Sequence, residues 1–259
     1  MLRRLRQDMP SFFCGRIIFL HSPRQCLVMH FMDGFLPIGW CVFWAVLAAP
    51  FLIYGMWKIT KMINNDRHVL PLMAVCGAFI FVVSLVDIPS PTGSCSHPTG
   101  TGLSASFFGP AVTSVLGLII LVFQALLLGH GGFTTLGATA FSMAVMGPLA
   151  AWLVFKGLRK TGRVPLGPAV FCAAVVANCV TYLITSLQIA LAYPVEGSVL
   201  TAFLAAAAVF AVVQIPISII EGIISGLVAT YIARIKPEIL QKLGVISGEE
   251  VKKVLSEQA

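Results

Sequence analysis

Six long apolar runs constrain this chain more than any other feature of its sequence. They cover residues 39–57, 70–88, 104–128, 133–155, 166–192 and 199–235. A helix needs about 20 predominantly apolar residues to cross a bilayer, and each run reaches or approaches that length. Only 10% of the residues are charged, whereas a soluble domain carries about 25%. The sequence therefore predicts an all-α integral membrane protein, which crosses the cell membrane several times.

The number of spans depends on how the longest run is divided. A helix over 199–235 would be a rod of roughly 55 Å, too long for one straight span. This run contains Gln214 and Pro216, and we expect two helices that meet there, which gives a bundle of seven transmembrane helices. One broken helix, and therefore six spans, is the alternative. We expect the run 104–128 to be a single span bent near Pro110.

Basic residues indicate how the bundle is oriented. They gather in the first loop and in the C-terminal tail: Lys58, Lys61, Arg67, Arg234, Lys236, Lys242, Lys252 and Lys253. The positive-inside rule places both groups in the cytoplasm and, with seven spans, the N-terminus outside. The basic loop 156–163 then falls outside, against the rule. We expect the tail 238–259 to form a short amphipathic cytoplasmic helix.

The first 28 residues are difficult to assign. They are rich in arginine, their short apolar stretch is interrupted by Arg16, and no small-x-small cleavage pattern precedes Met29. We interpret 1–28 as a doubtful N-terminal extension, either a mis-set start or a leader, and expect it to have no structural role. The membrane domain then covers 29–237.

The segment 29–37 reads Met-His-Phe-Met-Asp-Gly-Phe-Leu-Pro and lies at the mouth of the bundle. If Met29 is the first residue, its amine, the amide nitrogen of His30 and the imidazole Nδ1 of His30 can chelate one metal in a plane. A fourth nitrogen from His97 would complete a square-planar site, which suits Ni(II), Cu(II) and low-spin Co(II). Two spans separate His30 from the loop 89–102, so the two segments are expected on the same side.

Other residues near these segments are candidates for supporting roles. Asp33, Asp87 and Ser96 could hold a ligating imidazole in its orientation, although Asp33 also suits a simple turn. Cys95 is an alternative ligand, but a thiolate favours softer metals. Of the remaining histidines, two are expected away from the site: His68 in a cytoplasmic loop, and His130 in a tight turn on the opposite side. His21 falls in the extension.

Glu221 is an acid within an apolar run. Such residues are costly in lipid and often functional. It could pair with Asn178, act in transport, or be a neutral acid near an interface.

Four segments of the chain resemble the CbiM family, the substrate-binding subunits of energy-coupling-factor cobalt transporters. They are the start at 29–37, the loop 88–102 (Ile-Pro-Ser-Pro-Thr-Gly-Ser-Cys-Ser-His-Pro-Thr-Gly-Thr-Gly), the segment 126–137 (Leu-Leu-Leu-Gly-His-Gly-Gly-Phe-Thr-Thr-Leu-Gly) and the segment 214–222 (Gln-Ile-Pro-Ile-Ser-Ile-Ile-Glu-Gly). The resemblance is collinear over about 29–237. Phe31, Asp33 and the extension depart from the family pattern, and the extension conflicts with a free amine at Met29.

The resemblance implies an extra first helix before a six-helix core, and an N-terminus that lies outside and folds into the bundle. It implies a metal held by the amine of Met29, the amide and imidazole of His30, and His97. The implied function is capture of Co(II) for cobalamin biosynthesis, with a coupling membrane subunit, two ATPase subunits and a small accessory membrane protein as partners. Nickel is the alternative metal, since Asp33 is shared with the related nickel subunits.

Two other functional classes are less well supported by the sequence. An intramembrane enzyme would need a motif such as His-Glu-x-x-His or Gly-x-Ser-x-Gly, and none occurs. A stand-alone channel or secondary carrier would have only Glu221 as a buried coupling residue. No phosphate-binding loop occurs either, so ATP hydrolysis is expected in partner chains and this chain is not expected to be an enzyme.

Overall fold

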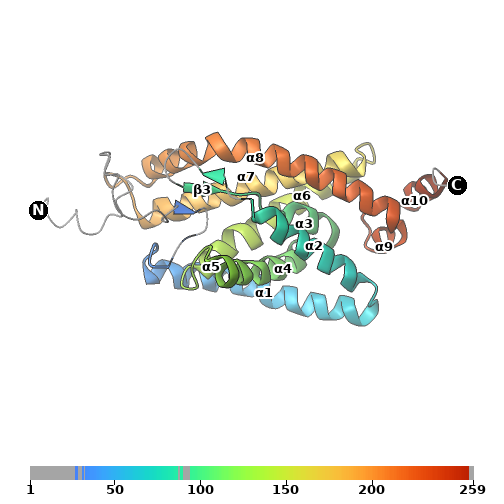
Figure 1. The fold of residues 1–259 in the computed structure, drawn as a ribbon, viewed down its shortest axis with the longest axis horizontal. Helices are drawn as coiled ribbons and strands as arrows, with labels where there is room; N and C mark the ends of the chain where they lie inside the picture. Colours follow the sequence, from blue (N-terminus) through green and yellow to red (C-terminus); the bar gives the residue numbers. More distant parts are fainter. Residues whose placement is uncertain (1–26, 29–30, 32, 87, 90–93, 257–259) are drawn as a thin grey trace, which may run out of the picture.

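The computed structural model describes residues 27–28, 31, 33–86, 88–89 and 94–256 and is a bundle of helices with one small sheet (Figure 1). The helices are α1 (Ile38–Asn65), α2 (Val69–Ser84), α3 (Thr101–Phe108), α4 (Pro110–Phe123), α5 (Leu136–Thr139), α6 (Gly147–Lys160), α7 (Leu166–Ala192), α8 (Val199–Ile235), α9 (Pro237–Lys242) and α10 (Gly248–Ser256). Two π-helical segments, η1 (Gln124–Leu128) and η2 (Ala140–Met146), continue α4 and join α5 to α6. The strands β1 (Leu27–Val28), β2 (Ile88–Pro89) and β3 (Ser94–Ser96) pair in the order β1-β3-β2.

Five helical stretches of the described chain are long and apolar enough to cross a membrane. They are Ile38–Asn65, Pro110–Leu128, Leu136–Lys160, Leu166–Ala192 and Val199–Ile235. The prediction of an all-α membrane bundle is confirmed, and the predicted run 166–192 coincides with α7. The second run is shorter than expected, because α2 has 16 residues and ends at Ser84.

The last apolar run forms one helix, so the expectation of two helices is wrong. α8 continues for 37 residues through Pro216. Proline removes one backbone N–H, but inside a bundle the neighbouring helices can hold such a helix together. α7 lies along α8 (Figure 1), and Gln214 and Ile217, which lie two residues before and one residue after Pro216, are buried. Packing therefore outweighs the local signal of the proline.

The third run also differs from its prediction, because it reverses direction instead of bending. α3 ends at Gly109, whose φ of +81° favours glycine, and α4 begins directly afterwards with Pro110. The hydroxyl oxygens of Ser104 and Thr113 lie 3.0 Å apart across this turn. Every residue of α3 is buried, so α3 lies inside the bundle and α4 returns to the end from which α3 started.

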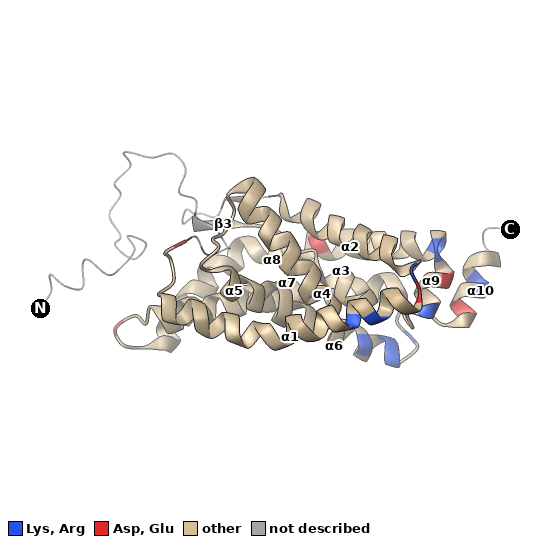
Figure 2. Cartoon of the chain, turned by 90° about the horizontal axis from the view of Figure 1, so that it is seen from below, with Lys and Arg blue, Asp and Glu red and all other residues tan. Residues whose placement is uncertain are grey.

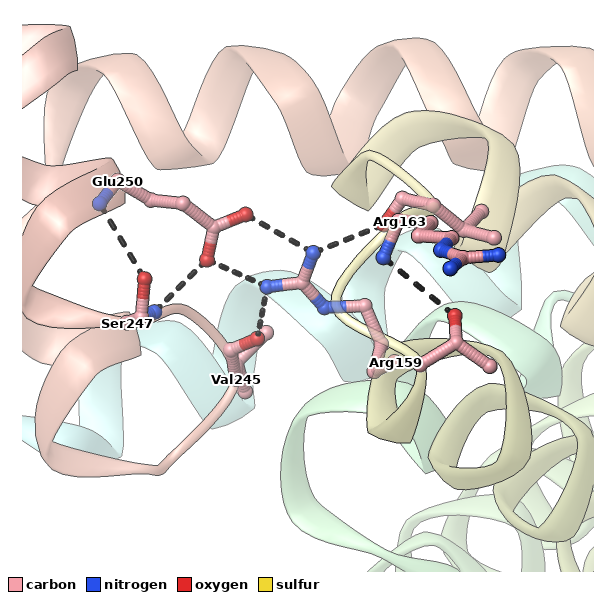
Figure 3. A network of polar contacts seen from close by, with 7 residues as sticks. Arg159, Arg163, Val245, Ser247 and Glu250 are labelled. Atoms are coloured by element: carbon pink, nitrogen blue, oxygen red, sulfur yellow. Dashed lines mark hydrogen bonds and ion pairs between the residues drawn. The ribbon is translucent and has the colours of Figure 1, made fainter.

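The reversal at Gly109 and the single helix α8 together remove the conflict over the basic loop 156–163. Arg159 donates two hydrogen bonds to Glu250 of α10, at 2.9 and 2.5 Å, and others to the carbonyl oxygens of Val245 and Val164 (Figure 3). The loop and the tail are therefore at the same end of the bundle. The expectation that they face opposite sides is wrong, because it divided the run 199–235, which lies between them, into two spans.

The tail is helical as expected, but it forms two helices that pack onto the bundle. Leu240, Val245 and Val251 are buried in the same hydrophobic cluster as residues of α3 and α6. Ser247 and Glu250 cap α10 reciprocally, since each backbone N–H donates to the other's side chain. The hydrogen bonds from Arg159 hold the pKa of Glu250 below its usual value. The tail is thus fixed against the end of α6.

Cysteine labelling can test this arrangement. Cysteines introduced at Gly162 and at Gln241, both exposed, should react from one side of the membrane, and a cysteine at the exposed Glu196 from the other. Lysine and arginine gather at the end that carries α9 and α10 (Figure 2), so we expect positions 162 and 241 to face the cytoplasm. If positions 162 and 241 react from opposite sides, α7 and α8 do not each cross the membrane once.

Candidate metal centre

The segment between β3 and α3 carries His97 into the interior of the bundle. Residues 96–100 are all buried, and the side chains of Ser96, His97 and Thr99 have no exposed surface. Gly100 ends the segment with a φ of +68°, and a Cβ atom there would lie 2.8 Å from the Cα atom of Ile80. Only glycine fits this combination of backbone conformation and close approach. The segment is therefore held against α2 on one side.

The hydrogen bond of the His97 ring identifies its tautomer. Nδ1 of His97 lies 2.8 Å from the carbonyl oxygen of Pro98. A carbonyl oxygen only accepts, so Nδ1 must carry the proton and donate. In neutral imidazole this leaves the lone pair on Nε2. Metal-ligating histidines commonly donate their other ring N–H to a carbonyl or carboxylate in this way.

Glu221 of α8 holds the same segment from the other side. Its carboxylate is fully buried and accepts hydrogen bonds from the backbone N–H of Thr99 (2.8 Å), the hydroxyl of Thr99 (3.0 Å) and the backbone N–H of Gly100 (2.8 Å). The side-chain amide of Asn178 in α7 also donates to it, which was one of the alternatives that the sequence left open. Four donors surround one carboxylate, which is the environment that an ionised acid requires.

Gln214 extends this polar cluster toward His97. Its Nε2 atom donates to the carbonyl oxygen of His97 (3.2 Å) and to Oδ1 of Asn178. From the sequence, Gln214 was interpreted as a helix boundary and was not expected near the metal site. The position of Gln214 in an apolar run could have indicated a place in a polar cluster, because a buried side-chain amide needs hydrogen-bond partners.

The N-terminal segment approaches His97 from the sheet. In β1, Leu27 pairs with Ser94 and Val28 pairs with Cys95 in a parallel register, two residues before His97. The extension 1–28 was expected to have no structural role, and its last two residues contradict this. Farther along, the hydroxyl of Thr135 donates to the carbonyl oxygen of Phe31 (2.5 Å), which is buried. Met29, His30 and Asp87 lie outside the described residues.

Asp33 is bound to the loop that follows η1. Its carboxylate accepts hydrogen bonds from the backbone N–H (2.8 Å) and the hydroxyl (2.6 Å) of Thr134. These bonds hold the pKa of Asp33 below its usual value. In this arrangement Asp33 joins the N-terminal segment to the loop 129–135. Ser96, the third supporting candidate, is buried, and its hydroxyl has no hydrogen-bond partner among the described residues.

His130 lies beside His97, and its predicted location on the opposite side is wrong. The two ring centroids are 5.9 Å apart and the rings are nearly perpendicular. The reversal at Gly109 explains the error, because it returns the end of α4 and the loop 129–135 to the end of the bundle where α3 begins. The loop also carries Thr134 and Thr135, so it covers the same region as the N-terminal segment.

The described residues contain no group of three histidine, cysteine or acidic side chains that could hold a metal ion. A metal site at His97 would therefore need ligands other than a group of three such side chains from the described residues. A family model described as the cobalt uptake substrate-specific transmembrane region matches residues 30–239 of this chain, which include His97. The chain belongs to the CbiM family.

Curated relatives agree with this assignment. The chain is 70% identical over 229 residues to a putative cobalt transport protein CbiM 2 of Methanocorpusculum labreanum, which covers 88% of this chain and 99% of that protein. It is 47% identical over 227 residues to the cobalt transport protein CbiM of Kyrpidia tusciae, with 87% of this chain and 92% of that protein covered. The resemblance seen in the sequence is confirmed at the level of the family.

The fold is also that of a known transporter. The structure matches the crystal structure of a truncated transition metal transporter with a TM-score of 0.66 and 26% sequence identity, over 78% of this chain and 97% of the other. A second transition metal transporter matches with a TM-score of 0.69 at 24% identity, which shows likeness of fold alone. The CbiM chain is thus a multi-pass membrane protein with a transition metal transporter fold.

Proposed function

We propose that this chain is the substrate-specificity subunit of an ATP-driven energy-coupling-factor importer, which captures Co(II) outside the cell and passes it inward for cobalamin biosynthesis. The observation that carries the proposal is the buried His97, whose Nδ1–H is bound to Pro98 so that Nε2 is the nitrogen with a lone pair. Membership of the CbiM family supports cobalt as the metal.

The proposed ligands are the amine of Met29, the amide nitrogen and imidazole of His30, and Nε2 of His97. Phe31, the residue after His30, supports this set. It is buried, and its carbonyl oxygen accepts a hydrogen bond from Thr135. The loop 129–135 that carries Thr135 also carries His130, whose ring packs beside that of His97.

The partners follow from what this chain does not contain. No phosphate-binding loop motif occurs in its sequence, so ATP hydrolysis is assigned to two ATPase subunits. A coupling membrane subunit and a small accessory membrane protein complete the proposed importer, in which the N-terminus of this chain faces outside. Nickel is the alternative substrate and a stand-alone channel or carrier the alternative mode of transport.

Metal titration and uptake together test this proposal. Purified protein that starts at Met29 should bind one Co(II) per chain, and a parallel titration with Ni(II) decides which metal is preferred. Cells that make the chain with its ATPase partners should accumulate radiolabelled cobalt, and inactivating the ATPases should stop uptake. Undiminished uptake without ATPases would indicate a stand-alone carrier, and absence of Co(II) and Ni(II) binding would refute the metal site.

A further inference from the structure

Glu221 and His97 are bound to opposite sides of a single peptide group. The peptide between Pro98 and Thr99 donates its N–H to Oε2 of Glu221 at 2.8 Å. Its carbonyl oxygen accepts the Nδ1–H of His97, also at 2.8 Å. A trans peptide is planar, and its N–H and C=O point in opposite directions. The carboxylate, the peptide and the imidazole therefore form one continuous chain of hydrogen bonds.

The burial of Glu221 makes this chain of hydrogen bonds significant. Removing a carboxylate from water is costly unless donors replace the water. Four donors do so here, and three of them belong to Thr99 and Gly100. One of the three is the N–H of the same peptide whose carbonyl oxygen is bound by His97. Glu221 thus fixes the backbone around the Pro98 carbonyl oxygen, which accepts the Nδ1–H of His97.

The rest of the cluster holds the same segment at a second point. Asn178 donates to Glu221 through Nδ2 and accepts from Gln214 through Oδ1, which fixes the orientation of its amide. Gln214 then donates to the carbonyl oxygen of His97. The main chain is therefore held at His97 and at Thr99 by one connected network from α7 and α8, on either side of the Pro98 carbonyl.

We propose that Glu221 is a positioning residue of the metal centre, acting on His97 through the Pro98–Thr99 peptide. A carboxylate that accepts the peptide N–H polarises the peptide and strengthens its carbonyl as an acceptor. The stronger acceptor keeps the proton on Nδ1 and increases the electron density at Nε2. Metal-ligating histidines are commonly paired with a carboxylate in a similar way, and here one peptide stands between the two. The inference rests on the proposed role of His97 as a ligand.

The Glu221→Gln variant tests the proposal. A carboxamide has nearly the same shape, but it must turn its NH2 toward a group that donated a hydrogen bond to the carboxylate. Affinity for Co(II) should fall by about 10–100-fold, the range for residues that support metal ligands from outside. With Ni(II), the absorption band of the four-nitrogen site should shift to lower energy, because water replaces a loosened imidazole. Ser225→Ala is the matched control. Ser225 is buried on α8 one turn farther on, and its hydroxyl has no hydrogen-bond partner in the described chain.

A double variant separates positioning from a merely structural role. If Glu221 acts through His97, the variant His97→Ala/Glu221→Gln should bind Co(II) as weakly as His97→Ala alone, because the interaction is already lost. Additive losses would overturn the proposal, as would wild-type affinity and an unshifted Ni(II) band in Glu221→Gln. If Glu221→Gln does not fold, Asn178→Ala replaces it, and a loss below about tenfold with the same band shift is expected because one of the four donors is removed. Unchanged binding in Asn178→Ala would then count against the proposal.

The outcomes distinguish this inference from the proposed function. If wild-type protein binds neither Co(II) nor Ni(II), the proposed function fails and the positioning role of Glu221 fails with it. If wild-type protein binds the metal and Glu221→Gln binds it equally well, only the positioning role of Glu221 fails. If Glu221→Gln binds normally but no longer supports uptake, Glu221 acts in transport and the positioning role is refuted.

Discussion

Replacing His97 with alanine should reduce the affinity for Co(II) by more than the about 10–100-fold that is typical of losing a supporting residue, because a direct ligand is removed. Water would occupy the fourth position. The three chelating nitrogens of Met29 and His30 would remain, so a weaker N-terminal complex should persist. Isothermal titration should report the loss, and the Ni(II) absorption band should shift to lower energy.

His68→Ala is the matched control for this variant. His68 is exposed at the start of α2, and its backbone N–H donates to Asp66, which is paired with Lys242 of the tail. It therefore lies at the other end of the bundle. His130→Ala, which the sequence analysis would have treated as neutral, is expected to weaken binding in part, because its ring packs against His97.

The dependence on pH provides an independent check. Protons compete with the metal for every nitrogen of the proposed site, and the amide of His30 must lose its proton to bind. The affinity should therefore fall steeply below about pH 6.5, the usual pKa of imidazole. Unchanged affinity in His97→Ala at neutral pH would exclude His97 as a ligand.

The sequence predicted the membrane helices better than it predicted their directions. Hydropathy identifies α7 and the range of α8 because lipid requires long apolar helices. It cannot show that a run such as 104–128 reverses, since a buried half-length helix like α3 is as apolar as a spanning one. Gly109 next to Pro110 was the only local signal, and we interpreted it as a bend.

The error in topology spread to the side chains that depend on it. His130 was assigned to the wrong end, and the basic loop around Arg159 to the wrong side, because both follow the reversal in the chain. By contrast, the pair of Glu221 and Asn178 was predictable, because an acid in an apolar run must find a donor. The backbone donors of Thr99 and Gly100 were not, since any residue carries an N–H and no pattern reveals which ones converge.

The extension before Met29 raises a question that concerns β1. A chain that begins at Met29 lacks Leu27 and Val28 and so lacks this strand. Two residues of pairing contribute little to the stability of a bundle whose core lies among the helices. The proposed amine ligand exists only if residues 1–28 are absent, and its loss would weaken metal binding strongly. We therefore expect metal-loaded protein to have the mass of a chain that starts at Met29.

A glycine inserted between Met29 and His30, in a chain that starts at Met29, should remove the dependence of metal binding on His97. The insertion moves the imidazole to the third position. The amine, two amide nitrogens and the imidazole then supply four nitrogens in a plane, so Ni(II) and Cu(II) could still bind and His97 would have no position to occupy. Specific Co(II) binding should be lost.

Combining this insertion with His97→Ala tests directly whether metal binding still depends on His97. In the parent chain His97→Ala should weaken Ni(II) binding strongly, whereas in the inserted chain it should change little. A glycine inserted beside Gly197, in the exposed turn between α7 and α8, controls for the effect of any added residue and should leave binding unchanged. If the inserted chain still requires His97, the metal is not held by the terminal chelate. The other ligands of a metal bound by His97 must then be sought among the side chains of the loop 129–135, where His130 already contacts the His97 ring.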